Sequence, residues 1–176
     1  DAFWAAFRLP NMFRRLFAEG AFQAAFVPLF QGKLIGEDKA EARRFAEEVL
    51  AALVFILTIL TVIVLIFAPL FVNVVATGFN DDPEKFDLTK LYLRIMFPYL
   101  ACMSIVGLLS GILNSLNRFL AYAGAPLLLN VSQITAIVLF ADAEIHLTGE
   151  ALAWATVISG ALQLALLLWG AHRQGY

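Results

Sequence analysis

Long, mostly apolar stretches alternate with short polar segments along the chain. The apolar stretches predict helices at about residues 1–30, 46–72, 91–116, 121–141 and 151–172. An α-helix needs about 20 mostly apolar residues to cross a bilayer, and each stretch reaches that length. The pattern therefore predicts an all-α integral membrane protein with five transmembrane helices.

Small, polar and proline positions predict how these helices begin and pack. Gly107, Gly111 and Ser115 recur every four residues, which is typical of a close helix–helix contact in a membrane. Asp87 is a plausible N-cap for the third helix, and Pro98 should kink that helix. Contacts or hydrogen bonds between helices are also expected for Phe22, Phe26, Phe30, Asn130, Ser132 and Gln133.

The composition supports the membrane class and excludes several others. The chain is 61% hydrophobic, whereas soluble domains average about 45–50%. A net charge of −2 gives no reason to expect a nucleic-acid partner. The single cysteine, Cys102, is expected to pack inside a helix, and His146 and His172 lie near opposite membrane faces. With no phosphate loop or nucleophile motif, we expect no metal, no cofactor and no enzymatic chemistry.

Basic residues in the short loops predict the orientation in the membrane. Lys85 and Lys90 lie on one side of the predicted helices, and six basic residues lie on the other. Those six are Lys33, Lys39, Arg43, Arg44, Arg118 and Arg173. The positive-inside rule then places residues 31–48 and the C-terminus in the cytoplasm. The first residue is not Met and the number of spans is odd, so we expect a fragment with at least one further helix before Asp1.

The first predicted helix is unusual because it carries charged residues. These are Asp1, Arg8, Arg14, Arg15 and Glu19. A charged side chain near the bilayer centre costs roughly 2.5–3.5 kcal/mol, whereas each Leu, Phe or Val returns only about 0.3–0.6 kcal/mol. The helix therefore needs neighbours that shelter its charges around a polar interior, which is typical of a transport path.

At 100° per residue the polar side chains of this helix form one stripe about 120° wide. The stripe contains Arg8, Asn11, Arg15, Glu19 and Gln23, and Arg14 points about 100° away from Arg15. Pro10 and Gly20 are expected to distort this geometry. The stripe fits a cationic cavity wall for a phosphate or pyrophosphate. It also fits arginines that snorkel or pair with acids on other helices, or an amphipathic helix on the membrane surface.

Four runs of sequence resemble the MurJ/MviN lipid II flippases of the multidrug/oligosaccharidyl-lipid/polysaccharide exporter superfamily. They are DAFWAAFRLPNMFRRLFAEGAFQAAFVPLF, FPYLACMSIVGLLSGILNSLNRF, APLLLN and ALAWATVISGALQLALLL. The resemblance covers essentially the whole chain. It implies helices two to six of a fourteen-helix, two-lobed exporter, so residues 1–176 would form part of the N-terminal lobe without its first helix or the second lobe.

The resemblance also implies a function in cell-wall biosynthesis. Such a flippase moves lipid II, an undecaprenyl-pyrophosphate-linked precursor, from the inner to the outer leaflet of the bacterial cytoplasmic membrane by alternating access. The implied partners are lipid II, membrane lipids and the remaining helices of the parent chain. Two other classes stay open: an exporter of another lipid-linked oligosaccharide or drug, and a non-transporting membrane scaffold.

The family motif LPNxxRRxFAEGAF implies roles for individual residues. By position, Arg14 is expected to contact the pyrophosphate and Arg15 is the second candidate, although the helical wheel favours Arg15. Asp1 and Glu19 match acidic positions suited to gating contacts at the two ends of the cavity, and Asn11 lies on the cavity stripe.

Overall fold

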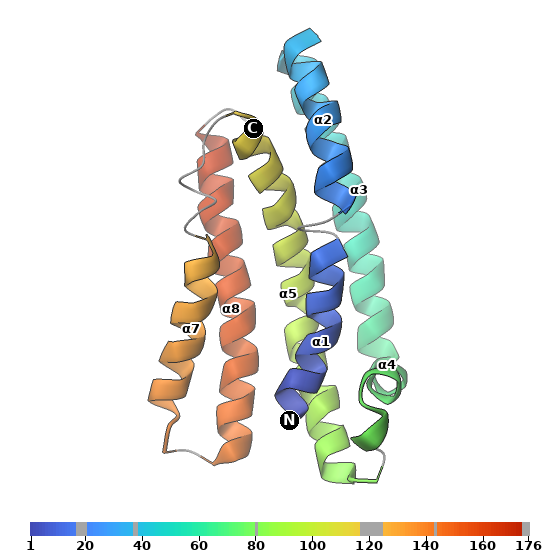
Figure 1. Ribbon diagram of the computed structural model, residues 1–176, viewed down its shortest axis with the longest axis vertical. Coiled ribbons are helices and arrows are strands. Elements are labelled where there is room, and N and C mark those ends of the chain that lie inside the picture. Colours follow the sequence, from blue (N-terminus) through green and yellow to red (C-terminus); the bar gives the residue numbers. More distant parts are fainter. Residues whose placement is uncertain (17–20, 37–38, 80, 117–124, 143, 174–176) are drawn as a thin grey trace.

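The computed structural model describes residues 1–16, 21–36, 39–79, 81–116, 125–142 and 144–173, and within these ranges the chain is helical without strands (Figure 1). The helices are α1 (Ala2–Arg14), α2 (Ala21–Gly36), α3 (Lys39–Ile66), α4 (Ala68–Val75), the 3-10 turn η2 (Thr77–Phe79), α5 (Pro83–Ser115), α7 (Ala125–Leu139) and α8 (Ile145–His172). The all-α class predicted from the pattern is confirmed.

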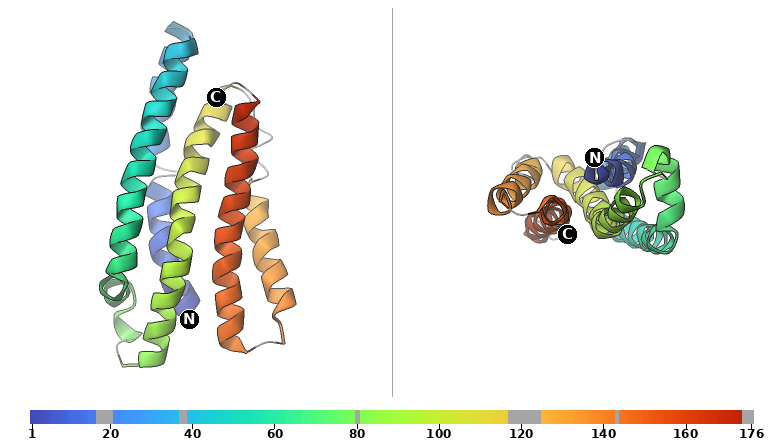
Figure 2. Two further views of the ribbon diagram at one scale, coloured as in Figure 1. Left: turned by 180° about the vertical axis from the view of Figure 1, so that it is seen from behind. Right: turned by 90° about the horizontal axis from the view of Figure 1, so that it is seen from below.

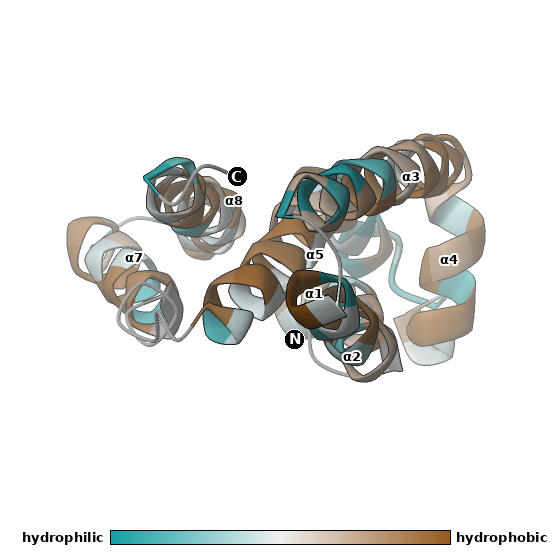
Figure 3. Cartoon of the chain, turned by 90° about the horizontal axis from the view of Figure 1, so that it is seen from above, coloured by the Kyte–Doolittle hydropathy of each residue, from teal (hydrophilic) through white to brown (hydrophobic). Residues whose placement is uncertain are grey.

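Helix α5 is the centre of the bundle. It packs against α1, α2, α3, α4 and α8, whereas α7 packs against α8 alone among the described helices. Seen along the bundle, α7 and α8 lie on one side of α5, and α1 to α4 lie on the other (Figures 2 and 3). In the most apolar stretch of α5, 72% of residues are buried inside the protein, against 17% for α3. Most of the apolar surface of α3 is therefore left for lipid or for other parts of a larger protein.

The described part of the first predicted helix, 1–30, is helical on both sides of residues 17–20, which lie outside the described residues. Helix α1 runs through Pro10 to Arg14, Arg15 and Leu16 continue in a π-helical turn, and α2 starts at Ala21. Pro10 leaves one backbone hydrogen bond unmade but does not end the helix. The expected distortion at Gly20 lies outside the described residues.

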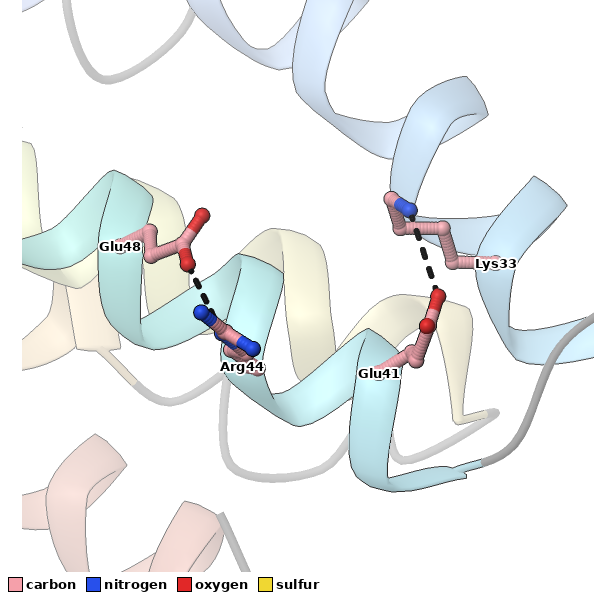
Figure 4. Close-up of polar contacts among 4 residues, drawn as sticks. All are labelled: Lys33, Glu41, Arg44 and Glu48. Carbon is pink, nitrogen blue, oxygen red and sulfur yellow. Dashed lines mark hydrogen bonds and ion pairs between the residues drawn. The ribbon is translucent and has the colours of Figure 1, made fainter.

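Helices α2 and α3 occupy most of the polar segment 31–48, whose second half is rich in helix-forming residues. Lys33, near the end of α2, lies 3.9 Å from Glu41 and stacks 5.8 Å from the ring centroid of Phe45. Helix α3 starts at Lys39 rather than near residue 46, and Arg44 pairs with Glu48 at 3.1 Å one turn further on (Figure 4). Ion pairs four residues apart stabilise exposed helix, so the charges extend the helix instead of ending it.

The predicted helix 46–72 also divides. Helix α3 ends at Ile66, and α4 begins after Phe67 with Pro69 in its first turn. Proline is favoured there because the first amides of a helix have no partner within the helix. Pro69 therefore helps to begin α4 and does not lie near the end of a continuous span.

Helix α5 begins at Pro83 rather than at residue 91. Its N-cap is Asp82, whose Oδ1 accepts a 3.2 Å hydrogen bond from the Lys85 amide, so the prediction of Asp87 as the cap is wrong. Asp87 lies inside the helix and pairs with Lys90 at 2.6 Å. Helix α5 is continuous across Pro98, so that residue does not end it. Helix α8 likewise starts earlier than expected, at Ile145 rather than 151, and α7 ends at Leu139, before the predicted residue 141.

The predicted contact face of α5 is confirmed, with α2 as its partner. A Cβ on Gly111 would lie 3.3 Å from Val27 Cγ2, so the absence of a side chain lets the two helices approach closely. Gln23 Nε2 donates a 2.9 Å hydrogen bond to the Gly107 carbonyl on the same face. Stacked rings of Phe22, Phe26, Phe30 and Phe45 continue this packing.

A second interhelical hydrogen bond joins α7 to α8, where Gln133 Nε2 donates to Thr156 Oγ1 at 3.3 Å. This is the role expected for Gln133. Three helices in the described ranges are long and apolar enough to cross a membrane: Lys39–Ile66, Pro83–Ser115 and Leu147–His172. Leu127–Leu139 is apolar but shorter, and the first predicted span is divided between two helices.

Candidate functional site

Helix α1 presents one face to α5. Phe3, Ala6, Leu9 and Pro10 are buried, at the three- and four-residue spacing that gathers side chains on one side of a helix. The ring of Phe7 lies 6.3 Å from that of Tyr99, and the ring of Phe13 lies 6.3 Å from that of Phe97. This aromatic packing fixes the rotation of α1 about its axis and therefore decides which residues face away.

The opposite face of α1 is cationic and exposed. Arg8 and Arg15 are both exposed, together with Trp4 and Met12. On a helix, residues seven apart differ in direction by only about 20°, so Arg8 and Arg15 share this face. The prediction that Arg8 and Arg15 lie on one side of the helix is confirmed.

Arg14 has different surroundings from its neighbour. Its side chain is partly buried, and its Nε donates a 3.1 Å hydrogen bond to Asn11 Oδ1, one turn earlier on α1. A side chain held by such a contact loses less rotamer freedom when it binds a ligand. The structure thus brings Asn11 and Arg14 together and leaves Arg15 exposed beside them.

The remaining predicted site residues are not gathered with the arginines. Asp1 is exposed at the start of α1, about 20 Å along the helix from Arg14 at 1.5 Å per residue. Glu19 lies outside the described residues. Gln23 does not continue the polar stripe, because its side chain bonds to the Gly107 carbonyl of α5.

Two cavities open near the start of α1, and sequence reasoning predicted neither. One, of 560 Å³, lies between α1, α5, α7 and α8, with Asp1, Glu84, Tyr92, Gln133 and Thr148 among its lining residues. The other, of 440 Å³, lies between α1 and the α4–η2 segment, and Arg8 lines it. The charge of Arg8 was visible in the sequence. The opposite wall of its cavity could not be predicted, because it depends on how α4 and η2 fold.

The arginines of this face can bind anions. A guanidinium group donates paired hydrogen bonds to phosphate or carboxylate groups. Among the described residues, no group of three or more His, Cys, Asp and Glu side chains could hold a metal ion.

A comparison with protein families decides the identity of the chain. A family model described as lipid II flippase MurJ matches residues 1–176. The chain belongs to the MurJ family. The MurJ membership confirms the resemblance seen in the sequence runs.

Several MurJ relatives are similar along almost the whole chain. A probable lipid II flippase MurJ of Rhizobium tropici is 46% identical over 178 residues, which covers 99% of this chain. The lipid II flippase MurJ of Burkholderia cenocepacia is 39% identical and covers 97% of the chain. The chain spans about a third, 33%, of the length of these MurJ relatives.

A solved MurJ structure shares the fold. The lipid II flippase MurJ in an inward closed conformation matches with a TM-score of 0.72 at 23% identity, over 94% of this chain and 35% of that chain. At this level of identity the match supports the helical arrangement of the bundle. It shows that α1 to α8 follow the path of part of a MurJ protein.

Proposed function

We propose that this chain is part of a lipid II flippase that moves the lipid-linked cell-wall precursor from the inner to the outer leaflet of the bacterial cytoplasmic membrane. The observation that carries the proposal is the MurJ family match over residues 1–176. The exposed cationic face of α1 supports it, because the cargo of such a flippase carries a pyrophosphate. The protein acts by binding and conformational change, and covalent catalysis has no part in it.

Arg14 and Arg15 contact the pyrophosphate in this proposal. A planar guanidinium can donate two parallel hydrogen bonds to phosphate oxygens, and a lysine cannot reproduce that fork. Asn11 holds Arg14 in a defined orientation through the 3.1 Å hydrogen bond to Nε. Arg15, exposed on the adjacent face, supplies the second cation.

Asp1, Asn11 and Glu19 have supporting roles in the same proposal. Asp1 and Glu19 are acidic positions near the two ends of the cationic stretch, where a carboxylate can pair with a cation of another helix when one end of the cavity closes. Asn11 lies between them at the cavity wall and positions Arg14.

The chain corresponds, in this proposal, to helices two to six of the N-terminal lobe, with residues 31–48 and the C-terminus in the cytoplasm. The α2–α3 hairpin and the end of α8 lie at the same end of the bundle (Figure 1). The basic residues Lys33, Lys39, Arg43, Arg44 and Arg173 belong to these segments. The opposite end carries Lys85 and Lys90 as its basic residues, and this asymmetry in Lys and Arg supports the proposed orientation.

Complementation tests the function and the site together. The full-length parent would be expressed in bacteria depleted of their own lipid II flippase, with membrane levels compared by immunoblot. We expect the wild type to restore growth and Arg14→Ala to fail at an equal membrane level, with Arg15→Ala weaker than wild type. Arg44→Ala, which removes an exposed arginine of α3, should grow as wild type does.

Each alternative predicts another outcome of the same experiment. A wild-type protein that is abundant but does not restore growth would indicate a different lipid-linked cargo or a drug. If the protein is a non-transporting scaffold that only has to be present in the membrane, Arg14→Ala would restore growth as the wild type does. Normal growth of both arginine variants would show that the assignment of the pyrophosphate site is wrong.

A further inference from the structure

The 440 Å³ cavity between α1 and the α4–η2 segment has an uneven lining. One wall is α1, with Asp1, Trp4, Ala5 and Arg8, and the other wall is the chain from Val75 to Phe79. Trp4, Val75 and Phe79 make part of this lining apolar. Arg8 and Asp1 are its two charged side chains.

Arg8 lies in this cavity without a hydrogen bond or ion pair to any residue that the structure describes. The bond from Cα to Cβ tilts toward the N-terminus of a helix, so a long side chain at residue 8 reaches back along α1 toward Trp4 and the cavity. A guanidinium that no described residue neutralises attracts an anion, the more so where the cavity walls exclude part of the surrounding water.

Asp1 does not neutralise Arg8 in this arrangement. The two residues are seven apart, which is about 10 Å along the axis of α1, and no ion pair joins them in the described part of the chain. Asp1 therefore lowers the affinity of the cavity for anions without filling the site. Because the Asp1 carboxylate repels an anion bound at Arg8, it favours dissociation of the ligand from the site.

We propose that this cavity is a second phosphate site, in which Arg8 binds the phosphate of a lipid headgroup. The guanidinium fork matches two phosphate oxygens. The hydroxyl of Thr77, exposed on the opposite wall, is a further donor at the lining. Trp4 and Phe79 provide apolar surface for the first carbons of the lipid.

The position of Arg8 relates this site to the proposed cargo path. Arg8 and Arg15 lie on the same exposed face of α1, about 10 Å apart along the helix axis. A pyrophosphate that leaves Arg14 and Arg15 toward the start of α1 would reach Arg8 next. The identification of the occupant as the cargo rests on the proposed flippase function, whereas phosphate binding by Arg8 does not.

Equilibrium binding of radiolabelled farnesyl pyrophosphate to the purified full-length parent tests the proposal. The measurement uses an Arg14→Gln/Arg15→Gln background, so that binding at the first site does not mask the second. In this background we expect Arg8→Gln to weaken binding at least fivefold. Arg8→Lys should recover part of the affinity, since it keeps the charge and loses the fork. Arg94→Gln, which removes an exposed arginine of α5 outside both cavities, should leave binding unchanged.

Competition then separates the two sources of phosphate. Displacement of the probe by unlabelled farnesyl pyrophosphate, with farnesol and phosphatidylglycerol ineffective, supports a site on the cargo path. Displacement by phosphatidylglycerol at equal or lower concentration would assign the cavity to a phospholipid headgroup and overturn its place on that path. If the Arg14→Gln/Arg15→Gln protein binds the probe equally well with and without Arg8→Gln, Arg8 does not form a phosphate site. That conclusion holds whatever the result of complementation.

Discussion

Arg14 and Arg15 are adjacent in the chain but differ in environment, and this difference gives them different expected roles. Arg14 is partly buried and bonded to Asn11, and Arg15 is exposed. A preorganised cation contributes more to binding than a mobile one, because less conformational entropy is lost. At the scale of single residues, Asn11 is therefore expected to act through Arg14.

A double-mutant cycle tests the role of Asn11. We expect Asn11→Ala to weaken pyrophosphate binding roughly tenfold, since a hydrogen bond to a charged group contributes about 1.5–3 kcal/mol and about 1.4 kcal/mol corresponds to tenfold. In an Arg14→Ala background the same substitution should have no further effect on the dissociation constant. An equal loss of affinity in both backgrounds would show that Asn11 does not act through Arg14.

The sequence predicted some of these residues and missed others for a physical reason. Arg8 and Arg15 were predicted on one side because α1 keeps its helical geometry through Pro10. Gln23 was assigned to the same side, which is wrong, because its Nε2 donates a hydrogen bond to the Gly107 carbonyl of α5, and the arginine face points away from α5. The periodicity of one helix does not reveal which neighbouring helix a polar side chain contacts.

At the scale of helices, α5 and α8 depend on glycine at their closest approach. A Cβ on Gly160 of α8 would lie 2.7 Å from Tyr99 Cδ2 and 3.2 Å from Cys102 Cβ of α5. Two neighbours on one helix would have to move together, so a methyl group there cannot be accommodated by a single rotamer change.

We expect Gly160→Ala to destabilise the full-length protein by about 1–3 kcal/mol, the usual cost of overpacking. The measurement is the thermal unfolding midpoint in detergent. Gly32→Ala is the matched control, because nothing lies within 4 Å of the Cβ position at Gly32 in α2. If Gly160→Ala unfolds at the temperature of the wild type, the α5–α8 interface is looser than described.

The start of α5 has a pH-dependent cap. The hydrogen bond from the Lys85 side chain, followed by that from the Lys85 amide, lowers the pKa of Asp82 below its ordinary value of 3.8. A lowered folded-state pKa means that the cap stabilises the helix above the unfolded pKa and is lost as the pH falls through the folded pKa.

Hydrogen exchange at the Lys85 amide measures this cap. We expect full protection at neutral pH and faster relative exchange once the pH falls below the normal aspartate range, after correction for intrinsic rates. Asp82→Asn should remove the pH dependence while keeping a side-chain acceptor. A wild-type amide whose corrected protection is constant down to the lowest pH would contradict the assignment of Asp82 as the cap.

Helix bounds and burial show how much of the fold was predictable at this scale. The contact face at Gly107 and Gly111 was predicted because small residues at four-residue spacing allow helices to approach closely in a membrane. The central position of α5 could not be predicted, because lipid-facing and protein-facing helices are both apolar. Helix α3 has no charged residue from Val49 to Ile66, yet its apolar part is the less buried of the two.

At the scale of the whole molecule, the bundle has two parts joined through α5. Helices α7 and α8 form one side, and α1 to α4 form the other, with α5 packed against α8 and against α1 to α4. The cationic face of α1 lies away from α5, and Arg8 and Arg15 are exposed on it. In a membrane this arrangement favours a neighbour or a ligand that supplies negative charge.

The central claim is that the arginines of α1 carry the pyrophosphate of lipid II across the membrane. Its most direct test is transport by the full-length parent in vesicles, with lipid II that reaches the opposite leaflet detected by a lipid II-cleaving enzyme added on that side. We predict that Arg14→Ala lowers the flipping rate at least tenfold and that Arg44→Ala flips lipid II at the wild-type rate. Wild-type rates in both Arg14→Ala and Arg15→Ala would contradict the claim.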